Sequence, residues 1–167
     1  MHPSLRLAAV TSIAFAVALL GGCAAPLFHN IQHAIDIAPT DVQANEGEFR
    51  GREILWGGRI VSVENLERTT EVEIVSYPLD RDRQPRTGNP TQGRFLLVLP
   101  GFAEPFDYQP GRHLTVHGVL SGTRHGWVQE HEYVYPLVDA RMVHVWPWGF
   151  MFDKRPQISI GIGARIR

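Results

Sequence analysis

The chain opens with a continuous apolar run and then changes to short alternating segments. Residues 7–20 are apolar apart from Thr11 and Ser12, which gives a run of 14 positions. A helix that crosses a membrane needs roughly 20 apolar residues. A shorter run near the N-terminus is typical of a secretion signal. The pattern therefore predicts that residues 1–22 form a cleaved signal helix.

The next segment, residues 23–50, has no clean period. Helical spacing recurs at Ile31, Ala34, Ile35 and Ala38. This spacing predicts one short helix, and residues 41–44 begin a second helical turn. We expect this segment to be a tether with a short helical part.

From residue 52 the pattern becomes that of β-strands. Between Thr69 and Tyr77, Val72 and Ile74 share one face while Glu71 and Glu73 share the other. Residues 94–99 are nearly all apolar, which indicates burial on both faces or closure of a barrel. The predicted strands cover residues 52–64, 69–77, 94–99, 113–120, 127–135 and 137–146. The pair Gly57-Gly58 lies inside the first strand and predicts a bulge or a tight bend.

About six closely spaced strands with Gly- and Pro-rich turns indicate a mainly β protein. The chain has 16 Gly and 12 Pro in 167 residues, which suits such turns. We predict a small antiparallel β-barrel, OB-like by analogy, over residues 51–147. Residues 148–167 are expected to form a C-terminal tail that adds an edge strand or frays.

Charge and cysteine content narrow the possible functions. Sixteen basic residues stand against 17 acidic ones, which argues against a nucleic-acid binder held by phosphate contacts. The only cysteine, Cys23, follows Leu20-Gly21-Gly22. This sequence resembles the bacterial lipobox, so we expect Cys23 to carry diacylglycerol and an N-acyl chain. Ala24 favours sorting to the outer membrane.

The candidate chemistry outside Cys23 is sparse. His113 and His117 share a strand face but lie about 13 Å apart by strand rise. Pairing of the predicted strands would allow a metal-binding set drawn from His113, His117, His131 and His144. Exposed histidines on the outside of a barrel would look the same in the sequence.

Pairs of carboxylates occur at Glu71 and Glu73 and again at Glu130 and Glu132. Glycosidases use such pairs, but a solvated strand face has the same pattern. No nucleophile motif or phosphate-binding glycine loop is present in the sequence. We therefore expect that the protein is not an enzyme and that it carries no cofactor other than the lipid on Cys23.

Aromatic residues cluster after the last strand. They are Trp146, Trp148, Phe150 and Phe152. At a period of two they would form an apolar ridge for a lipid, a peptide or a partner protein. Closure of the barrel end is the other interpretation of this pattern.

A series of blocks resembles the Slp (starvation-inducible) outer-membrane lipoproteins. The blocks are Gly51-Arg52, Leu55-Trp56-Gly57-Gly58-Arg59-Ile60, Val63-Glu64-Asn65, Val75-Ser76-Tyr77-Pro78-Leu79-Asp80, Gln92-Gly93-Arg94-Phe95, Gly101-Phe102, Glu104-Pro105, Asp107-Tyr108, Gly111-Arg112, Leu114-Thr115-Val116, Gly118, Tyr133, Tyr135-Pro136, Val138 and Trp146-Pro147. Their order carries the resemblance. It implies a periplasm-facing lipoprotein that is linked to stress, with no catalytic residues to carry over.

Three functions follow as hypotheses. The first is a non-enzymatic outer-membrane lipoprotein, anchored to membrane lipid through Cys23, that binds an envelope protein or a cell-wall component. The second is a periplasmic metal-binding or sensing lipoprotein that uses the strand histidines. The third is a purely structural envelope protein without a small ligand.

Overall fold

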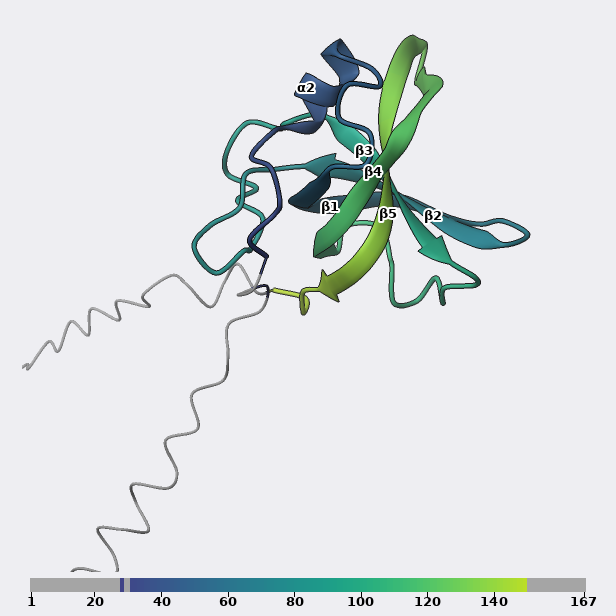
Figure 1. Ribbon diagram of the computed structural model, residues 1–167. Coiled ribbons are helices and arrows are strands. Elements are labelled where there is room, and N and C mark those ends of the chain that lie inside the picture. The colour runs from purple at the N-terminus through teal and green to yellow at the C-terminus, as the bar shows by residue number, and fades with distance from the viewer. Residues whose placement is uncertain (1–27, 29–30, 150–167) are drawn as a thin grey trace, which may run out of the picture.

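A computed structural model describes residue 28 and residues 31–149 (Figure 1). A short helix, α2 (Pro39–Ala44), precedes all the strands. The strands are β1 (Glu53–Asn65), β2 (Thr69–Ser76), β3 (Arg94–Pro100), β4 (His113–Val128) and β5 (His131–Val145). They close into a barrel in the order β1-β2-β3-β5-β4. β3 and β5 pair in parallel, whereas the other neighbours are antiparallel. This is an OB-like barrel, so the predicted fold class is confirmed.

The first strand joins the two halves of the barrel. Residues 53–59 pair with β4, and residues 58–65 pair with β2. Gly58 lies where both pairings meet, opposite Ser76 and Leu114. A Cβ atom on Gly58 would lie 2.0 Å from the carbonyl oxygen of Val75. Glycine is therefore required here by the close approach of two backbones. The bulge itself falls later, between Ile60 and Ser62.

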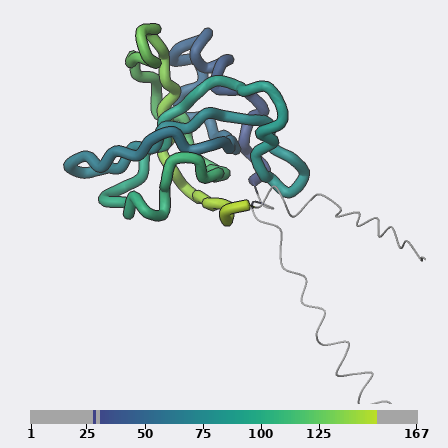
Figure 2. Tube along the Cα trace, turned by 180° about the vertical axis from the view of Figure 1, so that it is seen from behind, coloured from purple at the N-terminus to yellow at the C-terminus, as the bar shows by residue number. Residues whose placement is uncertain are grey.

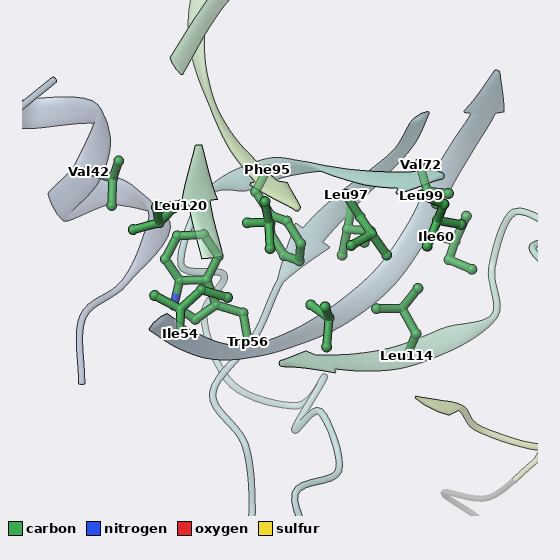
Figure 3. Close-up of a cluster of buried hydrophobic side chains, with 13 residues drawn as sticks. Val42, Ile54, Trp56, Ile60, Val72, Phe95, Leu97, Leu99, Leu114 and Leu120 are labelled. Carbon is green, nitrogen blue, oxygen red and sulfur yellow. The ribbon is translucent and has the colours of Figure 1, made fainter. Parts of the chain in front are cut away.

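The barrel interior is filled by alternate side chains from all five strands (Figure 3). Trp56 and Phe95 meet at its centre with ring centroids 5.2 Å apart. Val42 of α2 packs against the same cluster. The indole nitrogen of Trp56 donates to the carbonyl oxygen of Ile37 at 2.7 Å, so its polar atom is satisfied. The helix and the segment before it are thus attached to the barrel core.

Five strands are found in the described residues where about six were expected. The prediction of a turn at residues 122–126 and of a strand end at Pro136 is wrong. β4 continues to Val128, the chain reverses at residues 129–130, and β5 runs through Pro136. Along residues 131–136, β5 pairs only with β4. A strand with one free edge tolerates a proline. The ladder passes Gly122 with a register shift between Leu120 and Gly122 and continues through Gly126, so neither glycine ends the strand.

The helix expected from Ile31 to Ala38 is also wrong. Ile35 forms a parallel bridge with Ile54, and its amide donates to the carbonyl oxygen of Glu53 at 2.8 Å. The helix instead begins at Pro39, whose fixed φ suits a first helical position. The Asp41 carboxylate accepts from the amide of Ala38 at 2.7 Å and caps this end. The apolar spacing of residues 31–38 reflects packing of an extended segment on the barrel.

Within the described residues, no helix has the length and apolar character needed to cross a bilayer. Cys23 and the expected signal helix of residues 1–22 lie outside the described residues, as does the tail from residue 150.

Candidate functional site

The far halves of β4 and β5 form a hairpin that projects from the barrel beside α2 (Figure 1) and contacts β2 and β3 through its side chains. A groove of about 180 Å³ lies between this hairpin and the barrel wall. Its lining combines carboxylates, one arginine, one tyrosine and one leucine with a glycine and a serine. The residues are Ser62, Glu64, Glu71, Glu73, Leu96, Arg124, Gly126 and Tyr135.

Strand alternation explains why these side chains meet. In β2, Val72 and Ile74 are fully buried in the core, so Glu71 and Glu73 must point outward. Leu96 of β3 also faces outward, but it lies at the bottom of the groove and is only 8% exposed. The apolar floor and the acidic wall of the groove therefore come from neighbouring strands.

Glu73 is the centre of the polar network. Its Oε1 atom accepts from Nη1 of Arg94 at 2.6 Å and from the hydroxyl of Tyr135 at 3.1 Å. Its Oε2 atom accepts from the hydroxyl of Ser62 at 3.3 Å. The side chain is 18% exposed. Charge-assisted hydrogen bonds of this kind are the stronger ones in proteins, so they hold the hairpin against β2.

Tyr135 is kept neutral by its surroundings. Burial, followed by the nearby charge of Glu73, raises the pKa of Tyr135 to about 12. Its hydroxyl is therefore a hydrogen-bond donor across the physiological range. The ring of Tyr133 lies 4.8 Å from the ring of Tyr135. The hydroxyl of Tyr133 accepts from the backbone amide of Arg94 at 2.7 Å and adds a second link from β5 to β3.

Arg124 and Glu71 form a two-point ion pair. Nη1 and Nη2 of Arg124 donate to the two carboxylate oxygens of Glu71 at 2.9 and 2.5 Å. The hydrogen bond to Glu71 raises the pKa of Arg124, so the arginine stays charged. The planar guanidinium fits a carboxylate in this way, and lysine does not.

Gly126 sets the width of the groove. A Cβ atom at this position would lie 3.1 Å from Cε2 and 3.3 Å from Cδ2 of the Tyr135 ring. The bare backbone lets the tyrosine ring approach the opposite strand. The side chains of the other lining residues therefore surround the groove without filling it.

The chemistry of the groove suits ligands that donate hydrogen bonds. Three carboxylates line it, and the guanidinium groups of Arg94 and Arg124 already pair with Glu73 and Glu71. Such a surface disfavours phosphates and carboxylates. Hydroxyl groups can donate to the remaining carboxylate lone pairs, while Leu96 offers an apolar contact.

The structure does not assemble the candidate metal set. The Nε2 atom of His117 lies 3.2 Å from Oε2 of Glu53. The other carboxylate oxygen of Glu53 pairs with Arg141. His144 packs edge-on against Trp146 at 4.3 Å, and burial lowers its pKa. Burial and, to a smaller extent, the charge of Arg59 lower the pKa of His113. His131 is exposed at the start of β5. Across residues 28 and 31–149, no three His, Cys, Asp or Glu side chains converge as metal ligands would.

The predicted aromatic ridge divides into two parts. Trp146 is 7% exposed, and its indole nitrogen donates to the hydroxyl of Thr115 at 3.0 Å. Trp148 is 62% exposed. Trp146 is therefore buried against Thr115 of β4, whereas Trp148 is exposed. Phe150 and Phe152 lie outside the described residues, as does the lipid-attachment residue Cys23.

Sequence reasoning missed Arg124, Gly126 and Tyr135 as members of one site. The first two fall in the segment expected to be a turn. The usable signals were the alternation of Glu71 with Glu73 and of Tyr133 with Tyr135. Two polar faces with period two indicate strands, but they do not show that the strands lie opposite each other.

Comparison with known proteins identifies relatives. The profile of the outer membrane lipoprotein Slp family matches residues 20–160. An uncharacterized protein of Haemophilus influenzae is 30% identical over 119 residues, which cover 71% of this chain and 62% of that protein. The uncharacterized lipoprotein YeaY of Escherichia coli is 31% identical over 98 residues, or 59% of this chain and 50% of YeaY. The chain thus matches between half and two thirds of the length of these two relatives.

Two further proteins are similar to parts of this chain. The outer membrane protein Slp of Escherichia coli is 27% identical over 139 residues, which cover 83% of this chain and 73% of that protein. A solved mitochondrial single-stranded DNA binding protein of S. cerevisiae, Rim1, is 14% identical with a TM-score of 0.35. That match covers 57% of this chain and 94% of Rim1.

Proposed function

Because the chain belongs to the outer membrane lipoprotein Slp family, we propose that it is anchored through lipid on Cys23, faces the periplasm and binds an envelope glycan without catalysing a reaction. The observation that carries the binding role is the groove of Glu71, Glu73, Arg124 and Tyr135 between β2 and the hairpin.

The anchor is supported by the N-terminal sequence. An apolar run of 14 positions ends at Leu20-Gly21-Gly22-Cys23, and this is the only cysteine of the chain. Each buried CH₂ group of an acyl chain contributes about 0.8 kcal/mol, and stable anchoring takes more than one chain. A triacylated Cys23 would satisfy that requirement.

The groove supports a glycan rather than an anionic ligand. OB-type barrels commonly bind oligonucleotides or oligosaccharides on the face of strands 2 and 3, between the loops that follow strands 1 and 4. The groove lies on that face, but its free charge is acidic because its one arginine, Arg124, is paired with Glu71 while Glu64 adds a further carboxylate. The analogy with OB-type barrels supports this face as the ligand-binding face. The carboxylates of the groove favour sugars, which bear hydroxyl groups, over nucleic acid, which bears phosphates.

A non-enzymatic role is supported by how the carboxylates are used. A glycosidase needs one carboxyl group as an acid and a second as a base or nucleophile. Here Glu71 accepts from Arg124 of the hairpin, and Glu73 accepts from Arg94 of β3 and from Tyr135 of the hairpin, so both carboxylates are engaged in structural contacts. The groove therefore suits recognition rather than bond cleavage.

The binding role is tested by co-sedimentation of the purified lipidated protein, in detergent, with isolated peptidoglycan sacculi. Gly126→Val fills the groove beside Tyr135 and leaves the Arg124–Glu71 pair in place. Trp127→Ala is the matched control, because Trp127 is an exposed neighbour on the other face of the same strand. We expect the native protein and the Trp127 variant to sediment and the Gly126 variant to stay in the supernatant.

Equal sedimentation of the Gly126 and Trp127 variants would show that the groove does not bind the sacculi. Failure of the native protein to sediment would reject a cell-wall glycan as the ligand. A thermal melt of each variant confirms that it is folded before binding is compared.

The anchor is tested separately by Cys23→Ala. We expect this variant to lose labelled palmitate and to leave the outer-membrane fraction. Its retention there would overturn the assignment of Cys23 as the lipidated residue.

A further inference from the structure

One end of the barrel gathers exposed aromatic rings and arginines near the point where the N-terminal segment reaches the fold. In Figures 1 and 2 the β4–β5 hairpin rises at the top. The purple start of the described N-terminal segment, the β3–β4 loop of residues 101–112 and the end of β5 lie along the lower edge in both views. We call this edge, with the loop of residues 79–86, the anchor end.

A chain of contacts connects the parts of the anchor end. Ile31 and Arg83 line the same cavity, of about 440 Å³, between the N-terminal segment and the β2–β3 loop. The hydroxyl of Thr115 donates to the carbonyl oxygen of Arg83 at 2.6 Å and accepts from the indole nitrogen of Trp146 at 3.0 Å. Two residues later, the ring of Trp148 lies 3.6 Å from the Cβ position of Gly111 in the β3–β4 loop.

The anchor end carries apolar rings that nothing in the described residues covers. Phe102 and Phe106 are each 72% exposed, and Trp148 is 62% exposed. The β3–β4 loop is held in place, since Nη1 of Arg112 donates to the carbonyl oxygen of Asp107 at 2.8 Å and the amide of Ala103 donates to Thr70. Tryptophan is enriched at the headgroup level of bilayers, and phenylalanine is common on the apolar faces of segments that lie in that interface.

The anchor end also carries cationic side chains. Arg81, Arg83 and Arg86 are exposed in the β2–β3 loop. One carboxylate oxygen of Asp80 in that loop accepts from the backbone amides of Asp82 and Gln84, each at 2.9 Å, which shapes the loop. Guanidinium groups bind phosphate oxygens through paired hydrogen bonds. Three arginines against two aspartates give this loop an excess of positive charge, which favours contact with lipid phosphates.

The length of the tether fixes which end can reach the bilayer. Cys23 lies five residues before Phe28, so a fully extended chain spans at most about 18 Å. Phe28 is buried in the fold. A lipid on Cys23 would therefore hold this part of the barrel close to the membrane surface, while the hairpin and its groove point away.

We infer that the anchor end rests on the phospholipid headgroup surface, with Trp148 and the phenylalanines of the β3–β4 loop in the interface and the arginines of residues 81–86 on the phosphates. This inference rests on the proposed lipid anchor at Cys23. It gives the anchor a second role, which is to orient the groove toward the periplasm.

The orientation is tested by fluorescence quenching in vesicles. The lipidated full chain is reconstituted into vesicles of phosphatidylethanolamine and phosphatidylglycerol whose acyl chains carry bromine, a contact quencher of tryptophan. Trp127→Phe leaves Trp148 as the exposed tryptophan, and Trp148→Phe leaves Trp127 near the hairpin tip. The buried Trp56 and Trp146 give the same background in both variants.

We expect strong quenching in the Trp127→Phe variant and little in the Trp148→Phe variant. Equal quenching in the two variants, with both proteins floating with the vesicles, would overturn the orientation and leave the anchor intact. Loss of flotation itself would instead reject the anchor at Cys23. The two failures are therefore distinguishable.

The arginine contact has its own control. Arg81→Ala with Arg86→Ala removes two cations from the anchor end, whereas Arg50→Ala with Arg52→Ala removes two exposed cations outside it. We expect only the first pair to reduce Trp148 quenching, and to do so most at low salt, because added ions screen such contacts. Equal effects of the two pairs would reject a specific role for residues 81–86.

Discussion

The closed body of the barrel and the projecting β4–β5 hairpin are stabilised by different forces. The body holds fully buried side chains from all five strands, among them Ile54, Phe95 and Leu114. The hairpin beyond Gly122 is joined to β2 and β3 by ion pairs and hydroxyl contacts that centre on Glu71 and Glu73. Burial of apolar area resists local opening, whereas partly solvated polar links allow it. We therefore expect the body to resist local opening, and the hairpin, which forms one side of the groove, to open more readily.

The largest expected effect lies in the body, at Gly58→Val. A Cβ atom there would meet the carbonyl oxygen of Val75 at 2.0 Å, and Ile74 at 2.6 Å. Relief requires the β1–β2 ladder to separate, so we expect a loss of about 4 kcal/mol or more in the free energy of unfolding. Chemical denaturation measures it.

Gly88→Val is the matched control for that substitution, because no atom beyond its chain neighbours lies within 4 Å of a Cβ added at Gly88. We expect a change within about 0.5 kcal/mol, as for most surface substitutions. Similar losses at the two glycines would show that close approach is not what requires Gly58.

The next largest effect belongs to the hairpin, at Glu73→Ala. The substitution leaves Nη1 of Arg94 and the hydroxyl of Tyr135 without their shared acceptor. We expect a loss of about 1–3 kcal/mol, and faster amide hydrogen exchange along residues 124–135 with the body unchanged. If exchange rises equally in β1 and β2, the hairpin and the body unfold together and the comparison fails.

A smaller effect is expected for the pair of Arg124 and Glu71. The arginine side chain is 46% exposed and the glutamate 12% exposed, so solvent screens their attraction. A double-mutant cycle with alanine at both positions should give a coupling of about 0.5–1 kcal/mol. The coupling should shrink as salt is added. A coupling that is independent of salt would indicate packing by the arginine stem instead.

The smallest effect is a dependence on pH in the body. Burial lowers the pKa of His113 and His144 below the ordinary value of 6.5. As the pH falls below 6.5, the unfolded chain binds protons before the folded chain does, so the folded state loses stability. We expect the midpoint of thermal unfolding to fall modestly in this range.

His113→Gln should flatten that pH dependence, while His131→Gln serves as the control because His131 is exposed. An unchanged slope in the His113 variant would mean that other groups account for the loss. Glu71 and Glu73 accept hydrogen bonds from two arginines, a serine and a tyrosine, and none of these groups titrates in this range, so these contacts should be unaffected.

Local pattern was informative where one strand faces both core and solvent. The alternation in residues 69–77 predicted β2, and the apolar run of residues 94–99 predicted a strand covered on both faces, as Leu96 under the groove shows. The pattern failed at residues 31–38, where four apolar residues at helical spacing lie in an extended segment. It failed again at residues 122–126, where two glycines continue a strand instead of ending it.

The sequence by itself determined the family, the mainly β class and the alternation that sends Val72 inward and Glu73 outward, because these depend on residue type and on the period of a strand. Only the tertiary structure decided that Arg124, Tyr135 and Glu73 form one groove and that the candidate histidines lie in separate contacts. Such convergence depends on strand order and register, here β3 beside β5 and β4 beside β1. Residues more than 50 positions apart meet through that register, and no local pattern encodes it.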